Sequence, residues 1–82
     1  MDKERIWQLV LGELEVAMSR ANFNTWFKNT SLLKVEDDLV VIRVPNAFTR
    51  EWLRKKYTEE LKKLLAKHLG RVRTIEYQIG SV

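Results

Sequence analysis

Apolar residues near the start of the chain recur at helical spacing and predict a helix from Asp2 to Met18. At about 100° per residue, most of them fall in one broad arc, which indicates the face turned toward the core. Asp2 is a favoured N-cap, and Glu4 suits the positive end of the helix dipole. The arc consists of Ile6, Trp7, Val10, Leu11, Leu14, Ala17 and Met18.

Leu9 and Val16 fall outside this arc, beside Arg5 and Glu13. They are one heptad apart and form a small second apolar stripe on the same helix. Isolated apolar residues are normal on protein surfaces. Two interpretations therefore stay open, namely scattered surface residues and a contact with a second molecule.

A second, shorter helix is predicted from Phe23 to about Asn29, with Asn22 as its N-cap. Phe23, Trp26 and Phe27 have the i, i+3, i+4 spacing of a buried helix face. An aromatic cluster next to a helix-helix turn is more often core than ligand site. The pattern therefore predicts that these three rings pack against the first helix.

Two runs, Ser31–Glu36 and Leu39–Val44, predict a β-hairpin with its turn at Glu36-Asp37-Asp38. The second run is almost entirely apolar and β-branched, which is typical of a central strand covered by other elements. A last strand is predicted over Val72–Ile79. It alternates, with Ile75, Tyr77 and Ile79 on one side and Thr74, Glu76 and Gln78 on the other.

Pro45 ends the second strand, because proline has no N–H to donate to a ladder. Asn46 then predicts the N-cap of a long helix from Ala47 to about Leu69, which contains no glycine or proline, and Gly70 predicts its end. One face of this helix is expected to cover the sheet. That face contains Leu53, Tyr57, Leu61, Leu64, Leu65 and His68.

Phe48 and Trp52 fall on nearly the opposite side of this helix, next to each other at i, i+4. Packing within a small domain does not explain two large aromatic residues on a solvent side. One interpretation is contact with a partner. The alternative is that the first turn bends or is not helical, so that Trp52 folds back over the edge of the hairpin.

The 82 residues, of which 45% are apolar and 32% charged, indicate one small globular domain over residues 1–82. The expected fold class is α+β, with the order α-α-β-β-α-β and a three-stranded sheet packed against helices. This order resembles that of the KH nucleic-acid-binding folds, but their Gly-x-x-Gly loop is missing. Gly80-Ser81-Val82 is expected to begin a linker within a longer parent protein.

Residues for catalysis, metal binding or cofactor binding are not assembled in this sequence. There is no cysteine, His68 is the only histidine, and the three glycines are too far apart for a phosphate loop. We therefore expect a binding module rather than an enzyme, with no cofactor. No run approaches the roughly 20 apolar residues that span a bilayer, so a membrane partner is not expected.

The net charge of +4 permits an acidic partner without requiring one. Arg50, Arg54 and Lys55, beside Trp52, could hold phosphates while the ring stacks on a base. The same residues alternate with glutamates and could form an ordinary solvated helix face. A single-stranded nucleic-acid-binding module using this helix is therefore the alternative to a protein-binding domain.

Several motifs resemble the N-terminal domain of the bacterial replication initiator DnaA, and the resemblance covers essentially the whole chain. Each motif is weak by itself, but their order and spacing together are fairly specific. They are Ile6-Trp7-Gln8, Phe23-x-x-Trp26, and Pro45-Asn46-x-Phe48-x-x-x-Trp52 followed by Tyr57. A third hypothesis, that the chain is a free-standing regulator that mimics this domain, also stays open.

The resemblance implies a cytoplasmic, non-enzymatic interaction domain. It implies weak self-association, recruitment of the replicative helicase DnaB, docking of initiation regulators and weak binding of single-stranded DNA. By position, Trp7 matches the self-association tryptophan. Asn46, Phe48 and Thr49 match a regulator-docking surface, with Trp52 close by. Asn22 stands where some members have a helicase-contacting glutamate, and this departure puts that contact in question.

Overall fold

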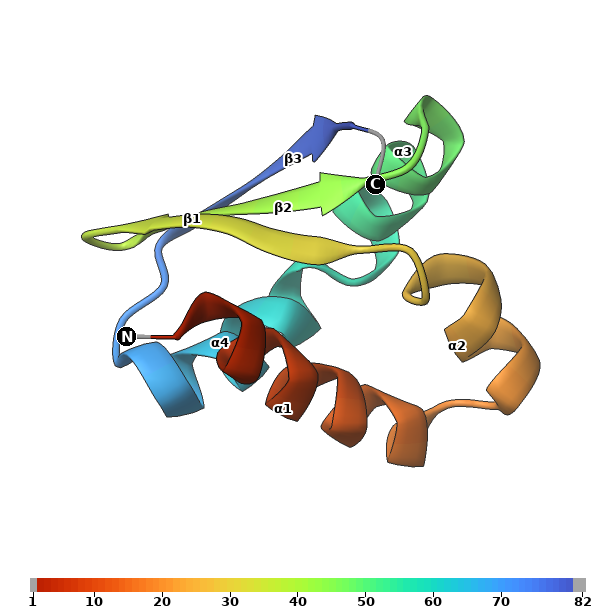
Figure 1. Cartoon of the computed structure of the whole chain (residues 1–82), viewed down its shortest axis with the longest axis horizontal. Coiled ribbons are helices and arrows are strands. Elements are labelled where there is room, and N and C mark those ends of the chain that lie inside the picture. The colour runs from red at the N-terminus through yellow and green to blue at the C-terminus, as the bar shows by residue number, and fades with distance from the viewer. Residues whose placement is uncertain (1, 81–82) are drawn as a thin grey trace.

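The computed structural model describes residues 2–80, and its elements follow the order α-α-β-β-α-α-β. The expected α+β class is confirmed, with one more helix than the sequence predicted. The elements, which Figure 1 labels, are α1 (Lys3–Ala17), α2 (Arg20–Trp26), β1 (Ser31–Glu36), β2 (Leu39–Val44), α3 (Ala47–Lys56), α4 (Thr58–Leu69) and β3 (Thr74–Ile79).

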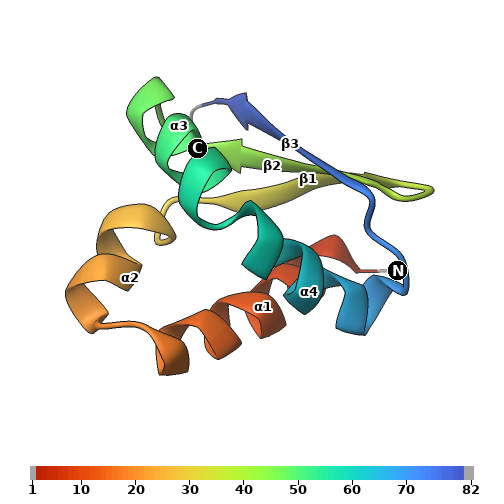
Figure 2. The same ribbon diagram turned by 180° about the vertical axis from the view of Figure 1, so that it is seen from behind.

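The sheet has the strand order β1-β2-β3, so β2 is central as its composition predicted. It pairs antiparallel with β1 and parallel with β3. Figures 1 and 2 show α1 and α4 side by side below the sheet, with α2 and α3 grouped at the end where β2 finishes. The predicted hairpin turn is confirmed, with Asp37 at a φ of 55°, a left-handed value that aspartate tolerates.

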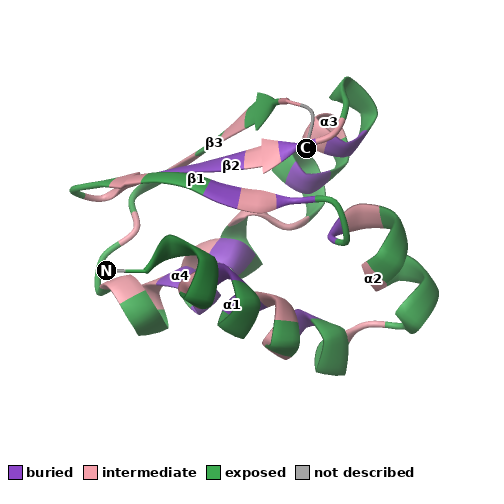
Figure 3. Cartoon of the chain, in the orientation of Figure 1, coloured by how far each residue is buried: buried purple, intermediate pink, exposed green. Residues whose placement is uncertain are grey.

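The core lies between the sheet and the helices, and Figure 3 shows buried positions in both layers, on β1 and β2 of the sheet and on α1 and α4. Alternate residues of β2, namely Val40, Ile42 and Val44, are at most 1% exposed. Burying each such side chain contributes about 1.5–3 kcal/mol. From the helices, the buried residues are Trp7, Val10, Leu14, Leu53, Leu61, Leu64 and Leu65, to which Phe27 adds its ring from the end of α2.

The single long helix predicted over Ala47–Leu69 is wrong, because the chain breaks it at Tyr57 into α3 and α4. The Thr58 hydroxyl donates to the carbonyl of Arg54 at 3.0 Å and lies 2.8 Å from the hydroxyl of Tyr77. Side-chain bonds of this kind compete with the helix ladder and bend helices. The bend lets α3 pack on β3 while α4 packs on α1.

The start of α2 also differs from the prediction. Ser19, not Asn22, is the N-cap, and its hydroxyl accepts from the backbone N–H of Asn22 at 3.2 Å. Serine caps as well as asparagine does, so the helix begins three residues earlier than expected and ends at Trp26. The predicted caps Asp2, Asn46 and Gly70 are confirmed at α1, α3 and α4 respectively.

Two residues assigned to buried faces are exposed, namely Ala17 and His68. In its last turn α4 runs beside α1, where His68 Nε2 lies 3.3 Å from Glu13 Oε1 and the Lys67 ammonium bonds the other oxygen at 2.8 Å. These two hydrogen bonds hold the pKa of Glu13 below its ordinary value, and the bond from Lys67 has the larger effect.

The strand β3 begins at Thr74, two residues after the predicted Val72.

Within residues 2–80, no helix is long and apolar enough to cross a membrane. The predicted linker falls at Gly80 and beyond. Gly80 still bonds to the sheet, since its N–H donates to the carbonyl of Val44 at 3.0 Å, whereas Ser81 and Val82 lie outside the described residues.

Candidate docking surface

Three aromatic side chains, Trp26, Phe48 and Trp52, form a patch where α2 meets α3, and we call it the aromatic patch. The rings of Trp26 and Trp52 are stacked, with centroids 4.6 Å apart and planes 9° apart. Phe48 packs against Trp26 at 5.4 Å. Such pairs contribute about 0.5–1.5 kcal/mol beyond burial, so the patch is a packed unit and not three independent side chains.

The exposure of the patch and the start of α3 test the alternative in which the first turn is irregular and Trp52 folds back over the hairpin. Phe48 is 71% exposed and Trp52 is 36% exposed. The first turn of α3 is regular, because the Asn46 side chain accepts from the N–H of Thr49 at 2.8 Å. Trp52 does not fold over the edge of the hairpin but rests on α2. An exposed phenylalanine is thus held in a fixed position, and most of its surface is left uncovered by residues 2–80.

The sequence predicts a core position for Trp26 from its spacing and does not indicate that its ring also supports Phe48 and Trp52. It is half-buried, packs against the core on one side and supports the aromatic patch on the other. Trp26 and Trp52 are 26 positions apart in the chain, and the sequence between them gives no local signal of their contact. The motif Phe23-x-x-Trp26 was the only indication.

Asn46 and Thr49 differ in what they can offer a partner. Asn46 is exposed beside Phe48, although its side-chain oxygen is used to cap α3. Thr49 is only 4% exposed, so its side chain lies below the surface. It supports the start of α3, and its part in docking stays a prediction.

A hollow of about 270 Å³ beside the patch is lined by Phe48, Glu51, Trp52, Lys55 and Lys56. The Lys56 ammonium lies 5.7 Å from the centre of the Trp52 ring, within the range of a cation–π contact. Neither Lys55 nor Lys56 forms an ion pair with another residue in the range 2–80. The hollow thus combines an apolar floor with two positive charges that no carboxylate of residues 2–80 neutralises.

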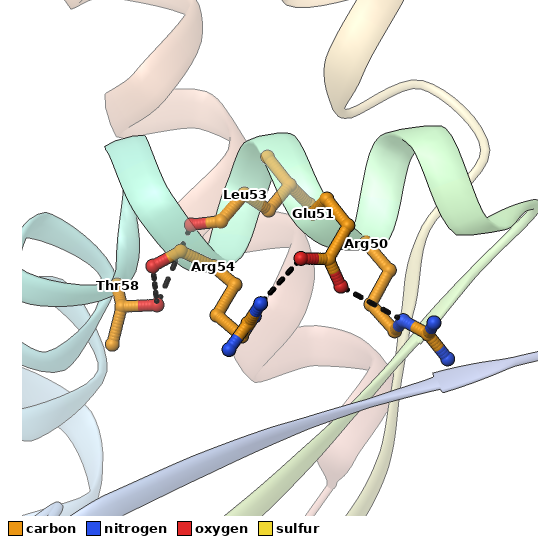
Figure 4. Close-up of polar contacts among 5 residues, drawn as sticks. All are labelled: Arg50, Glu51, Leu53, Arg54 and Thr58. Carbon is orange, nitrogen blue, oxygen red and sulfur yellow. Dashed lines mark hydrogen bonds and ion pairs between the residues drawn. The ribbon is translucent and has the colours of Figure 1, made fainter.

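Glu51 is already engaged by two arginines, as Figure 4 shows. Arg54 bonds one carboxylate oxygen, and Arg50 Nε lies 3.4 Å from the other. The hydrogen bond from Arg54, with a smaller contribution from Arg50, holds the pKa of Glu51 below its ordinary value. Glu51 therefore does little to offset the charge of the lysines.

The three residues considered for nucleic-acid binding are not brought together. Arg50 and Arg54 line a groove against β3, whereas Lys55 lines the hollow beside the aromatic patch. One face of the Trp52 ring is covered by Trp26. The Lys56 ammonium lies over the same ring, so little of the ring is free to stack on a base, and the positive charges are divided between two sides of α3.

Asn22 lies on exposed α2, one helical turn before Trp26. It is at the rim of a groove of about 600 Å³ between α1, α2 and the junction of α3 and α4. Lys56 lines both this groove and the hollow. The Asn22 position and the aromatic patch are therefore adjacent parts of one surface.

The residues considered for self-association divide into buried and exposed. Trp7 is 2% exposed, and its Nε1–H donates to the Thr30 hydroxyl at 3.1 Å. Almost none of the surface of Trp7 is free, so the residue has a structural role in the core, and its part in self-association stays a prediction. Leu9 and Val16 are 43% and 89% exposed, as the second stripe predicted.

Within residues 2–80 no cluster of three metal-ligating side chains is present.

The chain matches the family model of the DnaA N-terminal domain over residues 4–67. It is similar to the chromosomal replication initiator protein DnaA of Thermomicrobium roseum, with 35% identity over 79 residues. It is also similar to the protein of the same name from Nostoc punctiforme, with 40% identity over 67 residues.

These matches cover 96% and 82% of the chain but only 17% and 15% of the two relatives. The chain thus spans a small part of the length of the curated relatives that it matches. The domain is non-catalytic, as predicted from the lack of an assembled set of catalytic residues in its sequence. Because the family model covers most of the chain and the motifs lie in the predicted order on one fold, the chain belongs to the DnaA N-terminal domain family.

Proposed function

We propose that this domain is a protein-docking module of a chromosomal replication initiator, and that its aromatic patch binds the replicative helicase or a regulator of initiation. The proposal rests on one observation above all, the 71% exposure of Phe48 on a capped helix supported by two stacked tryptophans. Aromatic residues of this kind are typical hot spots of interfaces. The patch is pre-formed, so a partner would not have to order it.

The adjacent positions extend this docking surface. Asn46 borders Phe48 on one side, and Lys56 connects the patch to the groove at Asn22 on the other. A helicase contact at Asn22 would lack the carboxylate that some relatives supply. We therefore expect the aromatic patch to contribute more binding energy than Asn22 does.

A surface-mapping titration tests the proposed function. The ¹⁵N-labelled domain is titrated with the replicative helicase of the same organism, and we expect NMR signal changes at Phe48, Trp52 and the Trp26 indole N–H. Binding should depend weakly on salt, because phosphate contacts are absent. A steep salt dependence with a preference for single-stranded DNA would favour the nucleic-acid-binding alternative. Changes confined to other faces would contradict docking at the patch.

We also propose that the exposed stripe of α1 supports weak self-association. Leu9, Gly12 and Val16 follow one another along one side of α1. Apart from the helix backbone and the two neighbours of Gly12 in the chain, no atom of residues 2–80 lies within 4 Å of where a Gly12 Cβ would be. Exposed glycine inside a helix costs about 1 kcal/mol relative to alanine. Packing within the domain does not explain this glycine, whereas close approach of a second helix would.

Gly12→Ala is therefore expected to raise the free energy of unfolding by about 0.5–1 kcal/mol while weakening self-association. Leu9→Glu should abolish self-association, because it places a charge in the apolar contact. Sedimentation velocity over a range of concentrations measures both. Asn24→Glu, which adds the same charge on exposed α2, is the control and should not change the association. A strict monomer at high concentration would contradict the proposal.

A further inference from the structure

The two edges of the sheet are protected to different degrees. Edge strands expose backbone groups that can pair with another chain, and proteins commonly block them with bulges or lysines. On β1, the register shifts between Leu32 and Lys34, and the Lys3 ammonium donates to the carbonyl of Leu33 at 2.9 Å. On β3, the pairing with β2 is regular throughout, and the strand contains neither lysine nor proline.

The free backbone groups of β3 follow from its register. The N–H of Thr74 donates to the carbonyl of Asp38 at 3.3 Å, and that of Gly80 donates to the carbonyl of Val44 at 3.0 Å. Alternate residues of a parallel strand bond the same neighbour. The N–H and C=O groups of Ile75, Tyr77 and Ile79 therefore point away from β2 and take no part in its ladder. Within residues 2–80, none of these groups has another hydrogen-bond partner.

A groove of about 540 Å³ runs beside this edge, lined by Ile75, Glu76 and Tyr77 of β3 and by Arg50, Glu51 and Arg54 of α3. Figure 4 shows both guanidinium groups on the side of α3 that faces β3, held in place by Glu51. A guanidinium has five N–H donors, so each retains donors after bonding Glu51.

The charges of the groove are divided between the two faces of the sheet. Ile75 and Tyr77 turn their side chains toward the core, where burial raises the pKa of Tyr77. Glu76 must then point to the opposite, open face, because side chains alternate along a strand. An added strand would thus meet the two arginines on its helix side and Glu76 on its open side.

We propose that the free edge of β3 accepts an extended segment of a partner protein as a fourth strand, with acidic side chains at alternate positions facing Arg50 and Arg54. Backbone pairing would provide affinity, and the alternation of charge would provide specificity. This site is separate from the aromatic patch and from the stripe on α1, so it does not depend on the function proposed above.

The probe is a short capped peptide in which threonine and glutamate alternate, titrated into the ¹⁵N-labelled domain. Signal changes are expected at Ile75, Tyr77 and Ile79, whose amide protons should also exchange more slowly with solvent. Methylating the peptide nitrogens of one alternate set should abolish binding, whereas methylating the other set should not, because only one set faces β3. A peptide of the same composition with its glutamates in one block should bind at least about tenfold more weakly.

Protein variants complete the test. The double substitution of Arg50→Gln and Arg54→Gln is expected to weaken peptide binding at least about tenfold. Lys63→Gln on the exposed side of α4 is the control and should leave binding within about twofold of the parent. Equal binding of both methylated peptides, signal changes at Phe48 and Trp52 instead of β3, or no binding would each overturn the proposal. Slowed exchange at β3 that depends on protein concentration alone would overturn it in favour of a second copy.

Discussion

Trp7→Ala is expected to lower the free energy of unfolding by about 3–5 kcal/mol, the usual cost of removing a buried aromatic side chain. The indole is 2% exposed in the core between α1 and the sheet. It also donates to the Thr30 hydroxyl, which in turn donates to the carbonyl of Phe27 at 2.6 Å. Since a domain this small has little stability to spare, a substantial fraction of the variant should be unfolded at 37 °C.

Denaturant unfolding followed by far-UV circular dichroism measures this effect without relying on tryptophan fluorescence. Trp7→Phe keeps a ring but loses the hydrogen bond, so a smaller loss of about 1–2 kcal/mol is expected. Val16→Ala, at a position 89% exposed, is the control and should change stability by less than about 0.5 kcal/mol. If Trp7→Ala kept full stability and lost only self-association, the buried placement of Trp7 would be refuted.

The family resemblance and the helical periodicity of α1 lead to different expectations for Trp7. Matching by position assigned the role to Trp7, whereas the helical periodicity of α1 placed the same residue on the core side. The structure agrees with the periodicity. An effect of Trp7 on self-association would then act through the position of α1, and the direct contacts would come from Leu9 and Val16.

Much of the fold was predictable because its signals are local. The apolar run of β2, the turn at Asp37, and the caps Asp2 and Asn46 each depend on a few neighbouring residues, and all were confirmed. The same local reasoning failed at α2, where Ser19 and Asn22 are both good caps. The sequence alone does not rank them.

The remaining differences arise from contacts between residues far apart in the chain. The break at Tyr57 depends on a hydroxyl pair between Thr58 and Tyr77, and neither residue is a helix breaker by composition. The exposed position of Phe48 was predictable from the helical wheel. Its support by Trp26 was not, because no periodicity connects α2 to α3.

The second large effect is expected on binding at the aromatic patch. Phe48→Ala should weaken binding of the helicase or regulator at least about tenfold. Burying this ring in a partner contributes about 1.5–3 kcal/mol, equivalent to about ten- to a hundredfold in affinity. The free energy of unfolding should change by less than about 1 kcal/mol, because Phe48 is 71% exposed and its ring packs against the half-buried Trp26.

Two further variants separate docking from folding. Val16→Ala, also at an exposed apolar position but on α1, should leave both the affinity and the stability unchanged. Trp26→Ala removes the ring on which Phe48 and Trp52 rest, so it should lower both the affinity and the stability, the latter by more than Phe48→Ala does. One thermal melt and one calorimetric titration for each variant measure these quantities. A core phenylalanine would show the opposite pattern, with a loss of about 3–5 kcal/mol in stability and normal affinity of the folded fraction. That pattern for Phe48→Ala would place its ring inside the domain and remove the main support for docking at the aromatic patch.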